Sequence, residues 1–235
     1  MSGGDIHLPK EEEPTSIITK RVSPTPPRPR RHRFTFSHFI ALAVMLVLAA
    51  DGMVATQDLA FALFSLLYFC LLSKVAFPPL SPRSESPPVF KKTRLFNLYF
   101  FVSVIVSFSI SIILPIGYIL GGIYEGDKEG IMAAVPHVFL LSTQIFMEGV
   151  TFSCRFEMPI NAFVPVFYNT RRILTIMEWL RMEMAKVDEE YGWLRRLHVG
   201  RALAMANLAF WSFNLFGFLL PVYIPLAFDM YYGQR

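Results

Sequence analysis

Residues 131–152 read IMAAVPHVFLLSTQIFMEGVTF, a stretch that is apolar along most of its length. About 20 such residues are enough for a helix to cross the hydrocarbon core of a bilayer, so the stretch predicts a membrane span. It also contains His137, Gln144 and Glu148. Seven residues make nearly two helical turns and four make just over one, so these three side chains share one face of the helix.

Arg155 continues this face beyond the end of the stretch, and we call His137, Gln144, Glu148 and Arg155 the polar stripe. An ionisable side chain costs roughly 2.5–3.5 kcal/mol at the centre of a membrane helix. We therefore expect the polar stripe to face other helices or water and not lipid. Whether Glu148 is charged stays open, because burial favours its neutral form and a nearby Arg155 favours its charged form.

The apolar residues of the chain are gathered in long blocks, which is typical of membrane proteins. Of the 235 residues, 54% are hydrophobic, and the mean hydropathy is +0.44. The blocks predict an all-α integral membrane bundle with five transmembrane helices. They cover residues 36–54, 59–77, 96–123, 131–152 and 202–228.

The third block is longer than a span requires. Its residues 96–123 would make a helix of about 42 Å, whereas a hydrocarbon core is about 30 Å thick. We expect this helix to bend at Pro115, because proline removes a backbone hydrogen bond. Small residues recur every four positions, ending with Ser111 and then with Gly117 and Gly121. This spacing predicts a face that packs closely against another helix.

The last block carries Asn207 and Asn214, which are seven residues apart and share a face. Asn side chains form hydrogen bonds between membrane helices. We therefore assign both residues, with the polar stripe, to one candidate intramembrane polar site. Pro221 and Pro225 bend the far end of this block. A re-entrant block, which would return the C-terminus to the side from which the block entered, stays an alternative to a full span.

Residues 1–33 predict a disordered, basic, Pro-rich cytosolic tail, and residues 34–235 form the membrane domain. The tail has few apolar residues and no periodicity, so it cannot bury enough surface to fold. Four arginines between positions 28 and 33 directly precede the first span, where we expect them to bind anionic headgroups. The P-x-x-P patterns at 24–27 and 26–29 fit an SH3-like groove of a cytosolic protein partner, although an extended linker also explains them.

Residues 155–201 form the only sizeable polar segment after the tail. Within it, Ile173, Met177 and Leu180 begin a run of apolar residues spaced by four and three, which predicts a cytosolic amphipathic helix over 170–198. This helix is too charged to span a membrane. We expect its apolar face to lie on the membrane. The alternative is packing on a partner or, in a homo-oligomer, on a second copy of the chain.

Lys and Arg are distributed unevenly about the five predicted spans. The tail, the Pro/Ser-rich loop 78–95 together with Lys74, and the segment 155–201 carry 20 of the 22 Lys and Arg residues. These three parts share one side if every block spans. The positive-inside rule then predicts a cytosolic N-terminus and a lumenal or extracellular C-terminus, in an endomembrane or the plasma membrane.

Two segments carry a resemblance to a known family. Residues 34–44 read FTFSHFIALAV, and residues 191–228 read YGWLRRLHVGRALAMANLAFWSFNLFGFLLPVYIPLAF. They resemble a plant family of small, uncharacterised multi-pass membrane proteins, and the resemblance covers most of the chain after the tail. The resemblance implies that the protein is located in a membrane and comes from a plant. It implies no site residues, because the family carries no assigned activity.

The sequence contains none of the common catalytic or cofactor motifs, such as G-x-S-x-G, the P-loop, H-E-x-x-H or G-x-G-x-x-G. Its five histidines are scattered. We therefore expect no enzymatic activity, no metal site and no cofactor. A basic patch directly beside a membrane helix also gives no reason to expect nucleic acid as a partner.

Two functions remain. The first is a membrane-anchored interaction or scaffold component, in which the tail, the loop 78–95 and the amphipathic helix bind partners. The polar site then supplies hydrogen bonds between helices. The second is a small transporter or channel subunit, in which Glu148 exchanges a proton, His137 relays it, and Asn207 and Asn214 line the path. The two functions differ in whether the polar stripe contacts protein or water.

Overall fold

The computed structural model describes residues 35–78, 109–154, 156–186 and 191–233. The chain divides into two units, Met1–Arg31 and His32–Arg235. The first unit lies outside the described residues, and so do the predicted tail, nearly all of the Pro/Ser-rich loop, and Arg155. All the described residues belong to the second unit.

Every regular element in the described ranges is a helix, so the all-α prediction is confirmed for this part of the chain. Two of the elements, η1 and η2, are π-helices that run directly into α-helices. The elements are α1 (Phe36–Ala50), α2 (Thr56–Val75), η1 (Ser109–Ile113), α4 (Leu114–Glu125), α5 (Lys128–Ser153), α6 (Met158–Ala185), α7 (Tyr191–Ser212), η2 (Phe213–Tyr223) and α8 (Ile224–Tyr232).

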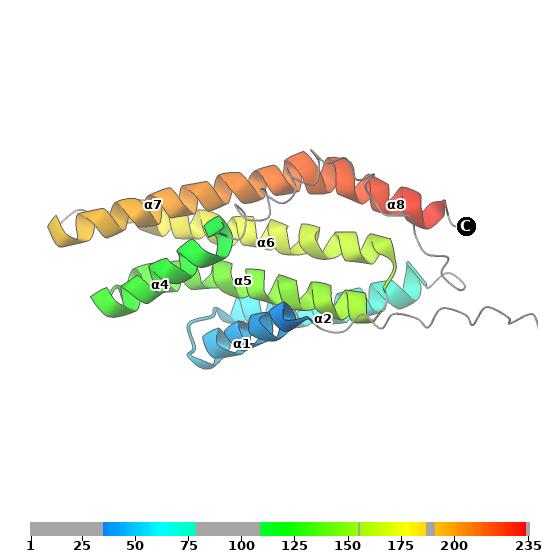
Figure 1. Cartoon of the computed structure of the whole chain (residues 1–235), viewed down its shortest axis with the longest axis horizontal. Helices are drawn as coiled ribbons and strands as arrows, with labels where there is room; N and C mark the ends of the chain where they lie inside the picture. Colours follow the sequence, from blue (N-terminus) through cyan, green and yellow to red (C-terminus); the bar gives the residue numbers. More distant parts are fainter. Residues whose placement is uncertain (1–34, 79–108, 155, 187–190, 234–235) are drawn as a thin grey trace, which may run out of the picture. The chain divides into compact units, whose positions relative to one another are not determined.

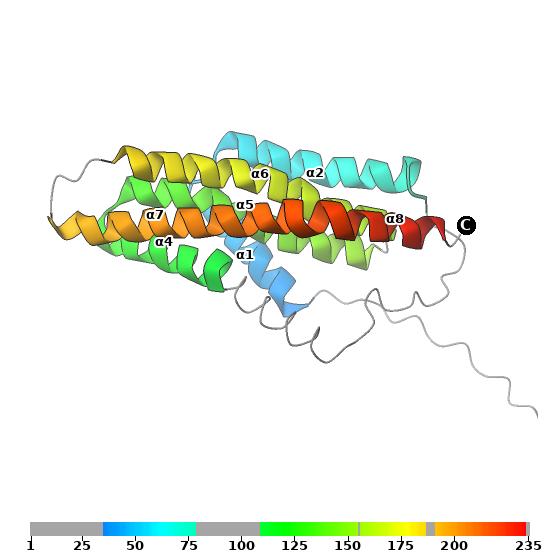
Figure 2. The same ribbon diagram turned by 90° about the horizontal axis from the view of Figure 1, so that it is seen from above.

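Helices α5 and α6 form the centre of the bundle (Figure 1). Helix α5 packs against α1, α2, α4 and α6, and α6 packs in turn against α7, η2 and α8. The two central helices are antiparallel, because Asp127 just before α5 forms an ion pair with Lys186 just after α6. Figure 2 shows α7, η2 and α8 following one another along the length of the bundle.

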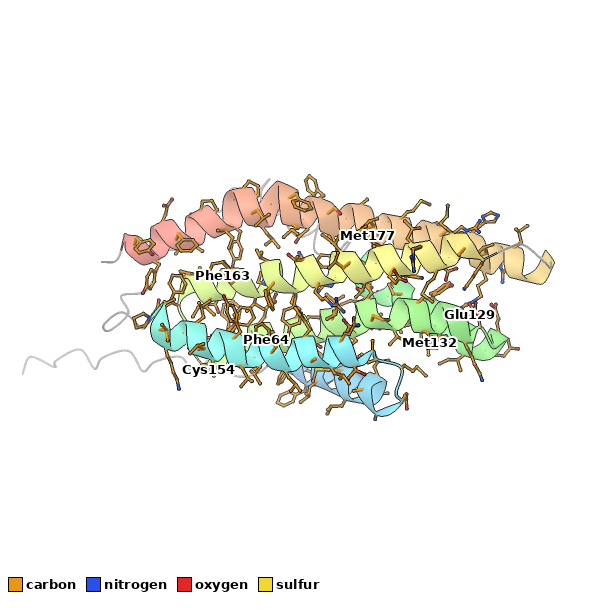
Figure 3. The ribbon with its side chains drawn as sticks, turned by 180° about the vertical axis from the view of Figure 1, so that it is seen from behind. Phe64, Glu129, Met132, Cys154, Phe163 and Met177 are labelled. Atoms are coloured by element: carbon orange, nitrogen blue, oxygen red, sulfur yellow. The ribbon has the colours of Figure 1, made fainter. Side chains whose placement is uncertain are left out.

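The bundle has two ends, which we name after a residue at each. At the Asp127 end, α5 begins and α6 ends. At the Phe77 end, the ring of Phe77, just after α2, contacts Phe163 near the start of α6 and Tyr231 in α8. In Figure 3, Glu129 and Cys154 mark opposite ends of α5, and Phe163 lies toward the Cys154 end.

The expected amphipathic helix over 170–198 is replaced by two helices, since α6 ends at Ala185 and α7 begins at Tyr191. Met177 lies on the apolar face that was expected to contact the membrane, and it is exposed, whereas Arg172 and Glu183 are fully buried. The exposure of this face is compatible with contact with a membrane.

The described part of the segment 155–201 extends along the bundle, whereas the sequence analysis placed the whole segment on one side of the predicted spans. Helix α6 runs antiparallel to α5 from the Phe77 end to the Asp127 end, so the segment does not stay at one end. Lys186 and Arg196 consequently lie beside Asp127, which the charge count had placed on the opposite side. The orientation drawn from that count, with the two termini on opposite sides, therefore loses its basis.

Three helices are long and apolar enough to cross a membrane: Thr56–Val75, Lys128–Ser153 and Leu194–Tyr232. The last is continuous through α7, η2 and α8, and its 39 residues make about 58 Å of helix. Phe36–Ala50 and Ser109–Glu125 are apolar but shorter. The structure is therefore compatible with a membrane protein.

The outer surface of the bundle is apolar along several helices. On α2, Leu63, Leu67 and Val75 are each about 70% exposed, at 67%, 70% and 73%. A water-soluble protein rarely exposes such a contiguous face. Phe64, labelled in Figure 3, belongs to the same face. Further large apolar side chains are exposed at Phe36, Phe39, Ile40, Leu46 and Val47 on α1, and at Phe213, Phe216, Phe218, Leu220 and Val222 on η2.

Candidate functional site

Helix α5 carries the described part of the polar stripe. Asp127 caps its first turn by accepting a hydrogen bond of 2.8 Å from the backbone N–H of Gly130. The helix continues through Pro136 to Ser153. His137 and Gln144 are buried and bonded to neighbouring helices, and Glu148 is half-buried and bonded to Gln144.

A chain of hydrogen bonds joins α5, α6 and η2 in the interior. Gln144 Nε2 donates to Glu148 Oε1 at 2.8 Å, and Gln144 Oε1 accepts from the guanidinium of Arg172. Arg172 also donates to Asn169 Oδ1 at 2.9 Å, and Asn169 Nδ2 donates to Asn214 Oδ1 at 2.7 Å. We call these five residues the Arg172 network. Three of them, Gln144, Glu148 and Asn214, were predicted as site residues.

Arg172 is the centre of this network and is fully buried. Its guanidinium carbon lies 4.0 Å from the centroid of the Trp211 ring, an arrangement in which the ring face stabilises the cation. Gln144 lies between the guanidinium and the carboxyl group of Glu148, so these two groups are linked through an amide. Within the described ranges, Arg172 Nε and Trp211 Nε1 are buried without a hydrogen-bond partner.

Arg172 and Asn169 were missed by the sequence reasoning, which placed their segment on the membrane surface. The spacing of certain residues in α6 could have identified both of them. Asn169, Arg172, Ile176, Trp179 and Glu183 follow one another by three and four residues, and all are buried. This face mixes polar and apolar residues in the same way as the polar stripe. It contacts α5 through the hydrogen bond from Arg172 to Gln144 and the ring contact of Trp179 with His137.

His137 and Asn207 form hydrogen bonds with a different part of the structure, the backbone carbonyls before Pro115. Proline has no N–H, so Pro115 cannot supply the donor that the Ser111 carbonyl accepts from in an α-helix or that the Ile110 carbonyl accepts from in a π-helix. His137 Nε2 lies 3.1 Å from the Ser111 carbonyl oxygen, and Asn207 Nδ2 donates to the Ile110 carbonyl oxygen at 3.1 Å. Both carbonyls belong to η1. The predicted bend at Pro115 therefore appears as a π-helix whose open carbonyls are satisfied from α5 and α7.

The structure thus divides the predicted site residues into two groups. Gln144, Glu148 and Asn214 belong to the Arg172 network, and His137 and Asn207 satisfy the carbonyls of η1. Because the Ser111 carbonyl can only accept, His137 must carry a proton on Nε2.

A second cluster of charges lies at the Asp127 end. Arg196 Nε donates to Asp127 Oδ2 at 2.7 Å, and Lys186 Nζ lies 3.6 Å from Asp127 Oδ1. Glu183 Oε1 accepts a hydrogen bond of 2.7 Å from the hydroxyl of Tyr118. We call these five residues the Asp127 cluster. It joins α4, α5, α6 and α7, the last through Arg196, which also stacks on the ring of Tyr118 at 4.2 Å.

The pKa of Asp127 is lowered by these contacts. Burial alone would raise the pKa. The hydrogen bond from the Gly130 N–H, the hydrogen bond from Arg196 and the positive charge of Lys186 all favour the charged carboxylate, and together they outweigh burial. A lowered pKa in the folded state means that this carboxylate stabilises the fold fully above the unfolded value of about 3.9. The contribution is lost as the pH falls through the lower folded value.

Replacing Asp127 with Asn tests this pH dependence. Asn remains a good helix cap, so the variant removes mainly the charge. We expect it to lower the free energy of unfolding at pH 7 by about 1–3 kcal/mol, the range for hydrogen bonds to charged groups. The difference from the parent should narrow as the pH falls below about 4. Thermal melting of the purified chain from pH 7 to pH 3 checks this, with the exposed Glu129→Gln as control. A difference that stays constant with pH would contradict it.

One further ion pair holds α2 to α6. Arg171 lies 2.8 Å from Asp58, whose side chain is 2% exposed. Deeper along the same pair of helices, the hydroxyls of Ser65 and Tyr168 share a hydrogen bond of 2.6 Å. Within the described residues, no group of three His, Cys, Asp or Glu side chains is arranged to hold a metal ion.

Comparison with known proteins identifies one family. A family described as a domain of unknown function (DUF7733) matches residues 34–232, which include all the helices described above. No curated protein and no solved structure matches the chain.

Proposed function

The chain belongs to this family, whose function is unknown, and we propose that it is a multi-pass membrane protein that acts as an anchored interaction or scaffold component. The observation that carries the proposal is the pairing of the buried polar groups. Gln144 is bonded to Arg172 and Asn214 to Asn169, and His137 faces a backbone carbonyl. Polar groups used in this way hold helices together in a membrane.

The apolar exterior supports an embedded bundle in which α6 also crosses. Its exposed face includes Leu174, Met177 and Met184, and its charged residues Arg172 and Glu183 are buried. Helices that carry ionisable residues in membranes turn them toward the bundle in this way. The bundle would then have more crossings than the five predicted from hydropathy, because α6 is added to them.

This arrangement changes the proposed orientation. An added Cβ at Gly149 would lie 2.3 Å from the ring of His38, so the start of α1 lies near the end of α5, at the Phe77 end. Helix α8 ends there too. In the sequence, seven Lys and Arg residues precede Phe36, and five more occur from Lys74, near the end of α2, to Arg94. We therefore propose that the Phe77 end faces the cytosol, with both termini on that side.

The interaction role is assigned to the cytosolic segments and not to the bundle interior. The Pro-rich tail fits a cytosolic protein partner, and its arginines fit anionic headgroups. We infer that the protein is not an enzyme and needs no cofactor, and that nucleic acid is not a partner. A homo-oligomer is compatible with the exposed faces of α1 and α2, because membrane helices also associate through such faces.

Proximity labelling tests this proposal. The full chain is compared with a variant in which residues 1–33 are replaced by a Gly/Ser segment of equal length. We expect the variant to lose its cytosolic neighbours and to remain in the membrane after alkaline extraction. An unchanged set of labelled neighbours would contradict the assignment of the interaction role to the tail.

Transport is the second candidate, and the unpartnered donors in the interior favour it. Arg172 Nε and Trp211 Nε1 leave hydrogen-bonding capacity unused beside Glu148 and its amide partner. Intramembrane ionisable residues often mark ion or proton paths. The anchored-component proposal predicts no proton flux above that of protein-free liposomes. A flux that the Glu148→Gln variant abolishes would replace it with transport.

A further inference from the structure

A groove of about 650 Å³ lies between α4 and α7. Its walls are apolar, with Leu114 on α4 and Val199 on α7, and three small residues, Gly117, Ala202 and Ala206, also line it. An added Cβ at Gly117 would meet nothing within 4 Å. Among the described residues, Gly117 therefore borders open space instead of the close helix contact that its spacing predicted. The groove has the volume of a small-molecule site, about 300–1,000 Å³.

The groove is polar at one end only. Arg195 and Arg196 line it at the start of α7, together with Glu125 at the end of α4. From there to Ala206 the α7 residues in its wall are Val199, Ala202 and Leu203, all apolar. Eleven residues separate Arg195 from Ala206, which corresponds to about 16 Å along the helix. A ligand that fits this arrangement has a charged head and an apolar chain.

The two arginines at the polar end differ in their availability. Arg196 is engaged by Asp127 at 2.7 Å and by Glu125 at 3.6 Å. Arg195 is exposed, and within the described part of the chain it has no hydrogen bond or ion pair. It also lines a shallow hollow of about 530 Å³ with His198. Arg195 is thus the cation that can accept an anionic group at the mouth of the groove.

We propose that the α4–α7 groove binds an anionic phospholipid, with one acyl chain along Leu114, Gly117 and Ala202 and the phosphate on Arg195. Guanidinium groups bind phosphate oxygens through paired, charge-assisted hydrogen bonds. The apolar length of the groove matches a chain that enters the membrane from its headgroup. This inference rests on the proposed membrane location, because only there are acyl chains available beside α4 and α7.

Thermal melting of the purified full chain in neutral detergent tests the site. We expect phosphatidylglycerol to raise the melting temperature more than phosphatidylcholine does. Glycerol phosphate, which offers the same phosphate without a chain, should have no effect. Arg195→Gln should weaken the apparent affinity for phosphatidylglycerol about tenfold, the loss of one charge-assisted hydrogen bond. Arg181→Gln is the matched control, since Arg181 is exposed on α6 and its ion pair is with the neighbouring Glu178.

Gly117→Leu tests the chain-binding part of the groove. Open space at this position admits a side chain without a clash, so the variant should fold and melt at least as high as the parent without lipid. It should then lose the stabilisation by phosphatidylglycerol. An unchanged lipid response in Gly117→Leu or in Arg195→Gln would overturn the proposal. So would a full response to glycerol phosphate, which would show binding of the headgroup alone.

The same preparation separates this inference from the proposed function. If alkaline extraction releases the parent chain from membranes, the membrane location is wrong and both proposals fall. If the chain stays embedded but phosphatidylglycerol stabilises it no more than phosphatidylcholine, only the lipid site is wrong.

Discussion

Replacement of Arg172 by Met is expected to lower the free energy of unfolding by about 3–5 kcal/mol, the range seen when one partner of a buried charged network is removed. The variant leaves Gln144 and Asn169 without their donor and Glu148 without its linked cation. Met fills much of the same volume, so the loss reports the network and not a cavity. Arg172→Lys should also be destabilised, because an ammonium cannot bond both amides and stack on Trp211 at once.

Thermal melting of the purified chains in detergent measures this effect. Arg181→Met is the matched control, since the Arg181 side chain is 79% exposed and its loss should change stability little. Glu148→Gln combined with Arg172→Met should destabilise less than the sum of the two single changes, because both act on one network. An Arg172→Met variant as stable as the parent would mean that the guanidinium is held at a cost to stability, which favours transport.

Replacement of His137 by Phe is expected to lower the free energy of unfolding by about 1–3 kcal/mol, since it leaves the buried Ser111 carbonyl without a donor. The Ser111 carbonyl lacks an α-helical backbone donor because Pro115 has no N–H. Pro115→Ala supplies a backbone N–H that can reach this carbonyl. In the Pro115→Ala background the His137→Phe change should therefore cost about 1 kcal/mol less than in the parent.

This double-mutant cycle separates a structural His137 from a proton relay. A relay would be removed by His137→Phe whatever stands at position 115, whereas a carbonyl-satisfying histidine becomes dispensable once the N–H is restored. The cycle is measured by denaturant or thermal unfolding of the four chains. Equal costs of His137→Phe in both backgrounds would contradict the role assigned here. Pro221→Ala, at a π-helix that His137 does not contact, serves as the control.

The sequence reasoning found the polar residues of the long apolar stretches more easily than their partners. His137, Gln144 and Glu148 stand out because a charge or an amide is costly within an apolar helix. Asn207 and Asn214 stand out for the same reason. Arg172 and Asn169 do not, because α6 carries Glu178, Arg181 and Glu183 nearby and so looks like a surface helix. Hydropathy averages over both faces of a helix, and only packing tells which face is inside.

The bend at Pro115 illustrates a second limit. A proline predicts the loss of one backbone donor, and it even identifies the carbonyl that this donor would reach, at Ser111 in an α-helix or at Ile110 in a π-helix. It does not identify the donors, because His137 and Asn207 lie 26 and 97 residues away along the chain. The third limit is topology. Placing Lys186 beside Asp127 required knowing that α6 runs the whole length of α5, which charge counting cannot reveal.

The central claim is that the polar interior is sealed by protein contacts, and cysteine labelling at Ser111 tests it most directly. Ser111 lies beside His137 in the bundle and is 2% exposed, and Ser111→Cys preserves its size. In a chain whose native Cys70 and Cys154 are changed to Ala, a membrane-impermeant maleimide is applied to either side of intact membranes. The account predicts no modification at Ser111→Cys and ready modification of the exposed Glu129→Cys control from the non-cytosolic side. Modification of Ser111→Cys from either side would reveal water in the interior and contradict it.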